Sequence, residues 1–342
     1  MRGGTSKGAY LLASDLPDDE TERDRLLVKL MGGPDALQVD GIGGGHPLTS
    51  KVAILSTSVD EAADIDYLFL QIDPTKQTVS RAQNCGNLLA GVGVYAIHHQ
   101  MVAVADDQTT VRVRMLNSGA ICHLLLQTPA GELQFTGDTA IDGVPGTAAP
   151  IVCNYVDIAG SSCGALLPTG RVIDSVDGVA LTCIDNGMPV VVLNAADFGL
   201  TGSESPDQLD TDEVLKAKLE SIRLQAGLLM NLGDVADKSV PKMCLVSKAS
   251  DGGLIMTRTF IPHVCHKSIG VLGAVSVATA CLIAGSCASG LADIPAGNPK
   301  TVRVEHPSGS LQVQLVLGAD GEIEKAGVVR TARILFVGEV ML

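Results

Sequence analysis

Apolar residues recur along the chain either at the helical spacing of three to four residues or at the strand spacing of two. The change from one spacing to the other divides the sequence into candidate helices and strands. Segment 18–31 is amphipathic, with acidic residues at its start and basic residues further on, which predicts a helix. Short apolar or alternating runs bounded by turn residues predict strands. In the first half of the chain these runs are 9–12, 52–55, 67–72, 111–115, 122–127 and 131–135, and the fourth and fifth form a hairpin around 117–119.

Two further segments are apolar almost all round, which is typical of helices buried on most sides. The first runs over 84–97, where Asn84 can cap the helix, Cys85 would lie in its first turn and Gly86 lets a ligand approach the backbone. Free N–H groups and the positive dipole end at such a helix start would hold a carboxylate and favour the thiolate of Cys85. The second segment follows Cys265, so we expect a second helix start of the same kind.

The order of these elements repeats in the second half of the chain. Later segments correspond in turn to the first loop and strand, the amphipathic helix, the strand headed by a lysine, and the hairpin; they are 186–193, 210–225, 240–246, and 302–305 with 311–315. Lys242 then corresponds to Lys51, and Cys265 to Cys85. We predict an α+β fold of two pseudo-symmetric halves, each a curled, mostly antiparallel sheet around one apolar helix. The predicted domains are 1–142 with 329–342, and 143–328.

Composition narrows the function classes. The 342 residues carry a net charge of −14, without a basic stripe, which argues against nucleic-acid binding. The nine cysteines show no metal-ligand spacing and no signal peptide is visible, so we expect reduced thiols and a cytoplasmic protein. The uncharged run 268–291 is interpreted as a buried core segment, not as a membrane span.

Several motifs together resemble the PrpF family, and the resemblance covers essentially the whole chain. They are Arg-Gly-Gly-Thr-Ser-Lys at 2–7, Asp-Gly-Ile-Gly-Gly at 40–44, Pro-Leu-Thr-Ser-Lys at 47–51, Asn-Cys-Gly-Asn at 84–87, and the segments 142–150 and 261–266. The resemblance implies the diaminopimelate-epimerase fold. The family includes 4-oxalomesaconate tautomerases of gallate and protocatechuate breakdown, methylitaconate isomerases and an aconitate-isomerising accessory protein. Segments 182–189, 222–227 and 230–235 look most like those of the tautomerases.

The resemblance implies a reaction that moves a double bond in an unsaturated tricarboxylate without a metal or organic cofactor. Lys51 matches the family's catalytic lysine and is expected to be the general base, which must be largely neutral to act. Lys242, its counterpart, could supply the cationic neighbour that favours the neutral amine. Cys85 is expected to be the second catalytic residue, either as proton donor or through shape and polarity alone.

The remaining candidates are expected to contact the substrate. They are Arg2, Thr5, Ser6, Ser50, Gly86, Asn87, Met188, Lys242, Arg258, His263, Cys265 and His266. Arg258 has an equally good interpretation as a salt-bridged strand residue. A small tricarboxylate is the expected partner, and a homodimer is left open.

The sequence therefore predicts a cofactor-independent isomerase with a lysine base in an interdomain cleft, with 4-oxalomesaconate as the first substrate. The alternatives are an aconitate or methylitaconate isomerase, or a non-enzymatic accessory protein of an aconitase-like enzyme. The final apolar strand, around 333–337, is expected to return to the first domain, where the sheet would otherwise have an open edge.

Overall fold

The computed structural model describes residues 1–342 except 83, 320, 322 and 342, and the chain divides into two compact units. Unit 1 comprises Met1–Val156 and Val329–Leu342, and unit 2 comprises Asp157–Val328. The sequence prediction divided the chain after residue 142. In the structure Ile151–Tyr155 pairs with the sheet of unit 1, so the segment after 142 stays with that unit as far as Val156.

The α-helices in the described part of unit 1 are α1 (Glu20–Leu30) and α2 (Gly86–His98). Its strands are β1 (Arg2–Gly3), β2 (Ser6–Leu12), β3 (Lys51–Thr57), β4 (Ile65–Asp73), β5 (Thr78–Ser80), β6 (Asp107–Met115), β7 (Ile121–Thr128), β8 (Ile151–Tyr155) and β17 (Ala332–Arg333). Asp19 caps α1 by accepting a hydrogen bond from the Glu22 amide at 2.8 Å. The amphipathic helix predicted over 18–31 is therefore confirmed, with its start set by this cap.

Unit 2 contains α3 (Pro206–Asp210), α4 (Glu213–Leu229) and α5 (Val271–Leu282). Its strands are β9 (Asp174–Val176), β10 (Val179–Asp185), β11 (Pro189–Asn194), β12 (Lys242–Ser247), β13 (Ile255–Phe260), β14 (Lys300–His306) and β15 (Gly309–Leu317). Strand β16 (Ile323–Arg330) begins in unit 2 and its last two residues belong to unit 1. None of the helices in the described part of the chain combines the length and apolar character that a membrane span needs.

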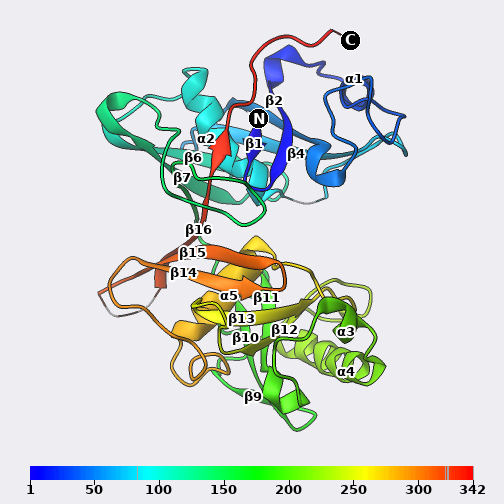
Figure 1. The fold of residues 1–342 in the computed structure, drawn as a ribbon, viewed down its shortest axis with the longest axis vertical. Coiled ribbons are helices and arrows are strands. Elements are labelled where there is room, and N and C mark those ends of the chain that lie inside the picture. Colours follow the sequence, from blue (N-terminus) through cyan, green and yellow to red (C-terminus); the bar gives the residue numbers. More distant parts are fainter. Residues whose placement is uncertain (83, 320, 322, 342) are drawn as a thin grey trace. The chain divides into compact units, whose positions relative to one another are not determined.

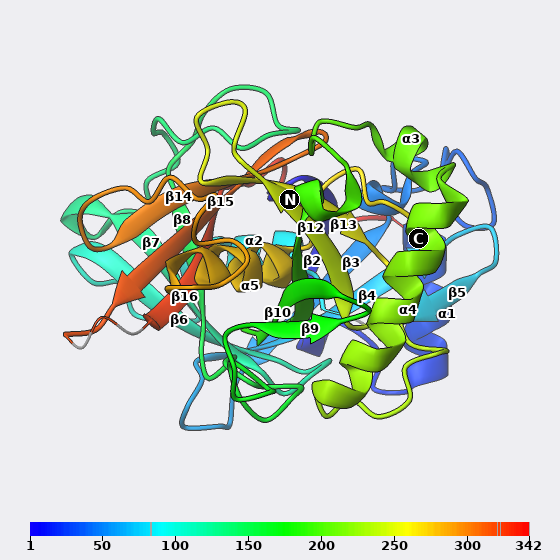
Figure 2. The same cartoon turned by 90° about the horizontal axis from the view of Figure 1, so that it is seen from below.

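The two units repeat one strand-pairing scheme (Figures 1 and 2). In unit 1, β2 pairs parallel with β3, β3 antiparallel with β4, β4 parallel with β6, and β6 antiparallel with β7. In unit 2 the same succession runs β11, β12, β13, β14, β15. Two parallel neighbours need a crossover connection between them. In unit 1 the crossovers contain α1 and α2, and in unit 2 the corresponding crossovers contain α4 and α5. The predicted α+β repeat is therefore confirmed.

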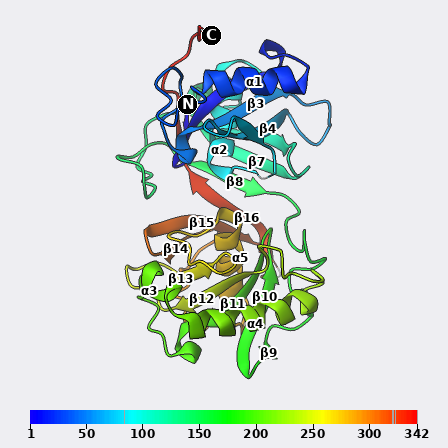
Figure 3. The ribbon, with the colours of Figure 1, turned by 90° about the vertical axis from the view of Figure 1, so that its right-hand side faces the viewer.

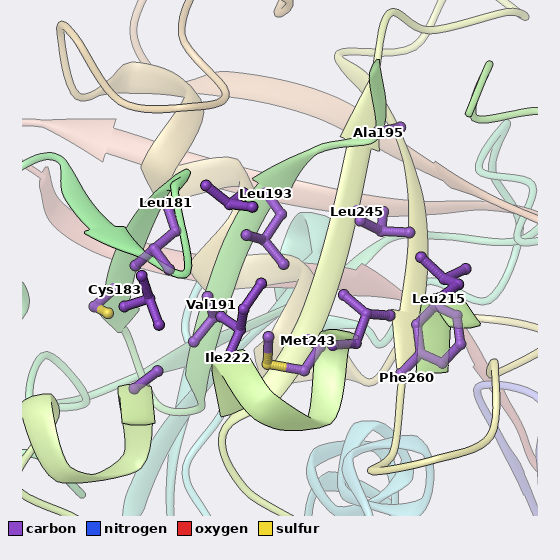
Figure 4. Packing of buried hydrophobic residues seen from close by; sticks show 14 of the residues in the cluster. Leu181, Cys183, Val191, Leu193, Ala195, Leu215, Ile222, Met243, Leu245 and Phe260 are labelled. Carbon is purple, nitrogen blue, oxygen red and sulfur yellow. The ribbon is translucent and has the colours of Figure 1, made fainter. Parts of the chain in front are cut away.

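An amphipathic helix covers one face of each sheet (Figure 3). Leu27 and Leu30 of α1 pack against Val52, Ile54 and Leu70 of the strands. In unit 2 the long helix α4 presents Leu215, Leu219 and Ile222 to β10, β11 and β12. Figure 4 shows Leu215 and Ile222 of this helix facing side chains of the strands. Aliphatic side chains at strand and helix spacing are sufficient to build this core without tryptophan.

The second helix of each unit is the apolar one, and it is buried. Leu88–Ala96 of α2 and Gly273–Cys281 of α5 are buried throughout, since both helices are contacted by several strands of their own sheet. For α2 these strands are β1, β2, β3, β4, β7, β8 and β17. Each sheet must therefore curl around its helix, as the sequence predicts.

Three of the four tyrosines of the chain pack around α2, and the fourth, Tyr95, belongs to that helix. Tyr10, Tyr67, Tyr95 and Tyr155 are at most 8% exposed. The Tyr10 hydroxyl donates to the Leu88 carbonyl at 2.6 Å, and that ring crosses the helix at Gly91, where a Cβ would lie 2.3 Å from the hydroxyl. Tyr67 donates to the carbonyl of Cys85 at 3.2 Å. Burial raises the pKa of all four phenols, that of Tyr95 to about 12.

Two expectations about strands are revised. The run 131–135 is not a strand: the chain turns at Ala130 and Gly131, both at positive φ, and β8 takes the place beside β7 instead. The final strand does return to unit 1, where Ala332 and Arg333 pair with β1. It is shorter than predicted: the strand ends at Arg333, and the apolar residues 335–337 lie beyond it and are exposed.

A buried carboxylate fixes the loop between β12 and β13 in unit 2. Glu305 of β14 is 2% exposed and accepts hydrogen bonds from the amides of Ser250, Asp251 and Gly253 at 2.7–2.8 Å and from the Ser250 hydroxyl at 3.1 Å. Burial acts to raise the pKa of this carboxyl, but the amides outweigh it and hold the pKa below its usual value.

Replacing this carboxylate should destabilise the protein. Glu305→Gln should lower the free energy of unfolding by about 2 kcal/mol at pH 7, because hydrogen bonds to charged groups contribute about 1.5–3 kcal/mol. Since the folded pKa is depressed, the stabilisation is complete above the unfolded value of about 4.3 and is lost as pH falls through the folded value. Urea unfolding followed by circular dichroism at pH 7 and pH 3.5 should show a smaller acid-induced loss in the variant. Glu324→Gln, at an exposed glutamate of β16, is the control; equal losses in all three proteins would contradict this role.

Candidate active site

Lys51 is the first residue of β3 and lies at the end of a glycine-rich loop. The 3-10 helix Pro47–Thr49 and the non-helical Ser50 bring the chain into the strand. Lys51 pairs in parallel with Gly8 of β2, and a Cβ on Gly8 would lie 2.5 Å from the Lys51 carbonyl oxygen. Glycine is therefore required beside Lys51, which explains the glycine that directly follows the motif at 2–7.

The side chain of Lys51 is buried, with the residue 7% exposed. Its Nζ donates to Oε1 of Gln71 at 2.7 Å and lies 5.0 Å from the centre of the Phe69 ring. No carboxylate forms an ion pair with Lys51 in the part of the chain that the structure describes. A lysine without an acidic partner is better suited to accept a proton than one held in a salt bridge.

Cys85 is the N-cap residue of α2, where the sequence predicted Asn84. Asn84 is exposed and instead donates to the Ser118 hydroxyl at 2.7 Å. The Cys85 carbonyl accepts from the Leu89 amide at 3.0 Å, which starts the helix, and from Tyr67. Among the described residues no side chain caps this helix end and no acidic residue occupies its first turn. The N-terminal N–H groups of α2 are thus suited to bind an anion.

Thr5 and Asn87 connect the glycine loop to the start of α2. Asn87 Nδ2 donates to the Thr5 hydroxyl at 3.0 Å, and the Thr5 amide donates to Asn87 Oδ1 at 3.4 Å. Gly86 is the first helical residue and is partly exposed. These residues together form a small polar surface at the helix start.

The other unit 1 candidates have structural contacts. The single proton of the Ser50 hydroxyl is shared between two acceptors, Gln38 Oε1 at 2.8 Å and the His46 carbonyl at 2.9 Å. Ser6 is 2% exposed, and its hydroxyl has no hydrogen-bond partner among the described residues. Arg2 donates through Nη1 to the Thr331 carbonyl and hydroxyl, at 2.9 and 3.0 Å, which secures the returning chain.

Lys242 occupies in unit 2 the strand position that Lys51 occupies in unit 1. It is the first residue of β12 and pairs in parallel with Val190 of β11. Its Nζ donates to the Ser239 carbonyl at 2.6 Å. Burial, and then the nearby Arg223 guanidinium, lower the pKa of Lys242. The prediction that Lys51 and Lys242 are equivalent is confirmed by the strand pairing.

Cys265 does not lie at a helix start, so that expectation was wrong. Helix α5 begins at Val271 with Gly270 as its N-cap, whereas Cys265 bridges Phe260 and is 2% exposed in the core of unit 2. The Cys265 amide donates to Asp210 Oδ1 at 2.6 Å. Burial and the Asp210 carboxylate raise the pKa of the Cys265 thiol to about 11. The equivalence of Cys85 and Cys265 is therefore one of chain order alone.

The remaining unit 2 candidates differ in exposure. Arg258 is 5% exposed and donates through Nε to the Glu204 carbonyl at 2.6 Å, a backbone contact in place of the salt bridge considered as its alternative. The Met188 carbonyl accepts from Ser276 of α5 at 2.8 Å. His263 is exposed, with Nδ1 3.5 Å from Glu220, and the exposed His266 accepts from the Ser268 amide at 2.9 Å. Substrate contact by these residues stays a prediction.

Sequence reasoning missed three residues on one face of β4. They are Tyr67, Phe69 and Gln71, which alternate along the strand. Tyr67 contacts the carbonyl of Cys85, whereas Phe69 and Gln71 both contact the amino group of Lys51. A glutamine continuing a row of inward-facing aromatic residues was the available signal. The partner it serves becomes visible only from the β3–β4 register, which pairs Lys51 with Gln71.

Comparison with known proteins gives concordant matches over the whole chain. A protein of Pseudomonas putida named 4-oxalomesaconate tautomerase is 55% identical over 342 residues, covering 100% of this chain and 94% of that protein. A Novosphingobium protein named (4E)-oxalomesaconate Delta-isomerase is 54% identical, covering 100% of this chain and 96% of that protein. The crystal structure of a methylitaconate-delta-isomerase is similar with a TM-score of 0.90 at 32% identity, covering 99% of this chain and 93% of that one. The family model for PrpF protein matches residues 1–342, and the chain therefore belongs to the PrpF family.

Proposed function

We propose that this chain is a cofactor-independent isomerase that converts 4-oxalomesaconate by allylic proton transfer, with Lys51 as general base. The observation that carries the proposal is its 55% and 54% identity, over the whole chain, to two proteins named for that isomerisation. The buried Lys51, free of a carboxylate partner among the described residues, supports the role of base. Breakdown of gallate and related aromatic compounds is the process we propose for it.

The proposed chemistry follows from the groups at the start of α2 and the head of β3. Lys51 takes a proton from the carbon next to the keto acid, and the electrons move into a dienolate. The N–H groups at the start of α2 stabilise the oxygens of this anion, since they are fixed dipoles that need no reorganisation. A proton then returns to the distant carbon, for which Cys85 is the proposed donor. The double bond has moved and no atoms are gained or lost.

The remaining predicted contacts are proposed as anchors for the three carboxylates. In unit 1 these are Arg2, Thr5, Ser6, Ser50, Gly86 and Asn87, of which Thr5 and Asn87 already form one polar surface with the helix start. In unit 2 they are Met188, Lys242, Arg258, His263 and His266; Cys265 is a core residue, 2% exposed, and is not proposed as an anchor. We also propose a cytoplasmic location, which is supported by nine free cysteines.

A second candidate function is isomerisation of methylitaconate. It is favoured by the TM-score of 0.90 to the methylitaconate-delta-isomerase structure, whose identity to this chain is 32%. Proton NMR of the purified protein in D2O with 4-oxalomesaconate, methylitaconate and cis-aconitate separates the candidates. Turnover and deuterium incorporation should be fastest with 4-oxalomesaconate. Binding of all three without exchange in any of them would favour the accessory-protein alternative.

The first prediction from this proposal concerns Lys51. Lys51→Met keeps the aliphatic stem in its buried site but removes the amine, so isomerisation should fall by about 10²–10⁴-fold, the usual contribution of a general base. Exchange of the allylic proton of 4-oxalomesaconate with D2O should fall equally, while the melting temperature stays near that of the wild type. Lys76→Met, at an exposed lysine in the β4–β5 turn, is the control and should retain full activity. Unchanged exchange in Lys51→Met would remove Lys51 from the proposal.

The second prediction concerns Cys85. Cys85→Ser should slow product formation more than it slows allylic proton exchange, because the amides at the start of α2 that stabilise the dienolate survive the change. The two rates are measured in one NMR time course. The opposite pattern, with exchange abolished in Cys85→Ser but normal in Lys51→Met, would identify the thiolate as the base.

A further inference from the structure

The side-chain amide of Gln71 is held in one orientation. Its Nε2 donates to the carbonyls of Ser50 at 3.0 Å and Pro47 at 3.1 Å, while its Oε1 accepts from Lys51 Nζ at 2.7 Å. If the amide were rotated by half a turn, its Nε2 would face the donor Nζ of Lys51. Its Oε1 would then face the carbonyl oxygens of Pro47 and Ser50, which cannot donate a hydrogen bond. Gln71 therefore always presents its oxygen to the amino group.

Two residues of β4 thus define where the amino group of Lys51 lies. Gln71 is the cross-strand partner of Lys51, and Phe69, two residues earlier on the same face, places its ring 5.0 Å from Nζ. Because one N–H of the Lys51 amino group is donated to Gln71, the amino group cannot turn freely, and the directions of its other bonds and lone pair are restricted. A base held in this way needs little further ordering to reach a substrate proton.

The repeat provides an internal comparison. Lys242 stands at the same strand position in unit 2, but the β12–β13 register places Thr259 where unit 1 has Phe69. That pairing ends at Met243 and Phe260, so Ile261, the next residue of the chain, stands beyond the end of β13 where unit 1 has Gln71. Lys242 donates to the backbone carbonyl of Ser239 instead. A lysine at the head of this strand can therefore be accommodated without an amide or a ring beside it, and the fold alone does not require Gln71.

We propose that Gln71 is a positioning residue for Lys51, orienting the amine for proton transfer through the Oε1–Nζ hydrogen bond. The proposal rests on the function proposed above and deepens it. Gln71 acts through Lys51, so its replacement should change kcat and the pH dependence of the rate but leave KM unchanged. A glutamine that only filled space in the sheet would affect stability and leave the pH dependence alone.

Two substitutions of Gln71 should move the pH–rate profile in opposite directions. Gln71→Glu places a carboxylate beside Nζ and favours the charged amine, so the pH of half-maximal rate should rise by about 1–3 units. Gln71→Leu removes the hydrogen-bond acceptor of the charged amine, and the pH of half-maximal rate should therefore fall. The maximal rate should drop by about 10²-fold because the amine is no longer oriented. Gln108→Glu, the same change at an exposed residue of β6, is the control and should match the wild type.

The profiles are measured by isomerisation of 4-oxalomesaconate, and a second readout needs no turnover. Trace labelling of Lys51 with acetic anhydride, quantified by mass spectrometry across pH, reports the neutral amine directly and should shift upward in Gln71→Glu. If both Gln71 variants keep the wild-type profile and labelling curve, the proposal is overturned, even if they unfold more readily. Full activity in Lys51→Met would instead overturn the proposed base, a result that Gln71 variants cannot produce.

Discussion

Burial of one uncharged helix inside a curled sheet is the requirement on which both units depend. Helices α2 and α5 carry apolar residues on every side, so neither is stable unless strands contact it from several directions. Parallel pairs joined by crossovers bring those strands together. The same packing determines where α2 begins, because Tyr10 and Tyr67 of the surrounding strands bind the carbonyls of Leu88 and Cys85. The proposed anion site is a consequence of the core.

The two copies of the repeat keep the same strand pairing but have diverged in chemistry. Unit 1 has a buried lysine held by an amide oxygen and a half-buried cysteine at a helix start. In unit 2 the lysine binds a backbone carbonyl, and the corresponding cysteine is a core residue whose pKa is raised. The two lysines thus differ in their contacts at matching strand positions, whereas the two cysteines match in chain order alone. Packing depends on the apolar faces of strands and helices and not on the residues at their ends.

Local signals in the sequence predicted the elements whose periodicity or caps are strong, including α1, the β6–β7 hairpin, β11 and β12. They did not predict that β8 displaces the run 131–135, because that choice depends on pairing between distant segments. Cys265 was misplaced for a similar reason: chain order aligned it with Cys85, but α5 begins five residues after His266. The proposal for Lys51 could be made from its motif, whereas the contact between Lys51 and Gln71 becomes apparent only from the register of two strands.

The distribution of the tyrosines has a spectroscopic consequence. The chain has no tryptophan, and all four tyrosines are buried in or around α2 in unit 1, so unit 2 contains neither residue. Tyrosine emission and near-ultraviolet ellipticity therefore report on the packing of unit 1 almost alone, whereas far-ultraviolet ellipticity averages over both units. Comparing these signals during one denaturation tests whether the two units unfold together, without any label having to be attached.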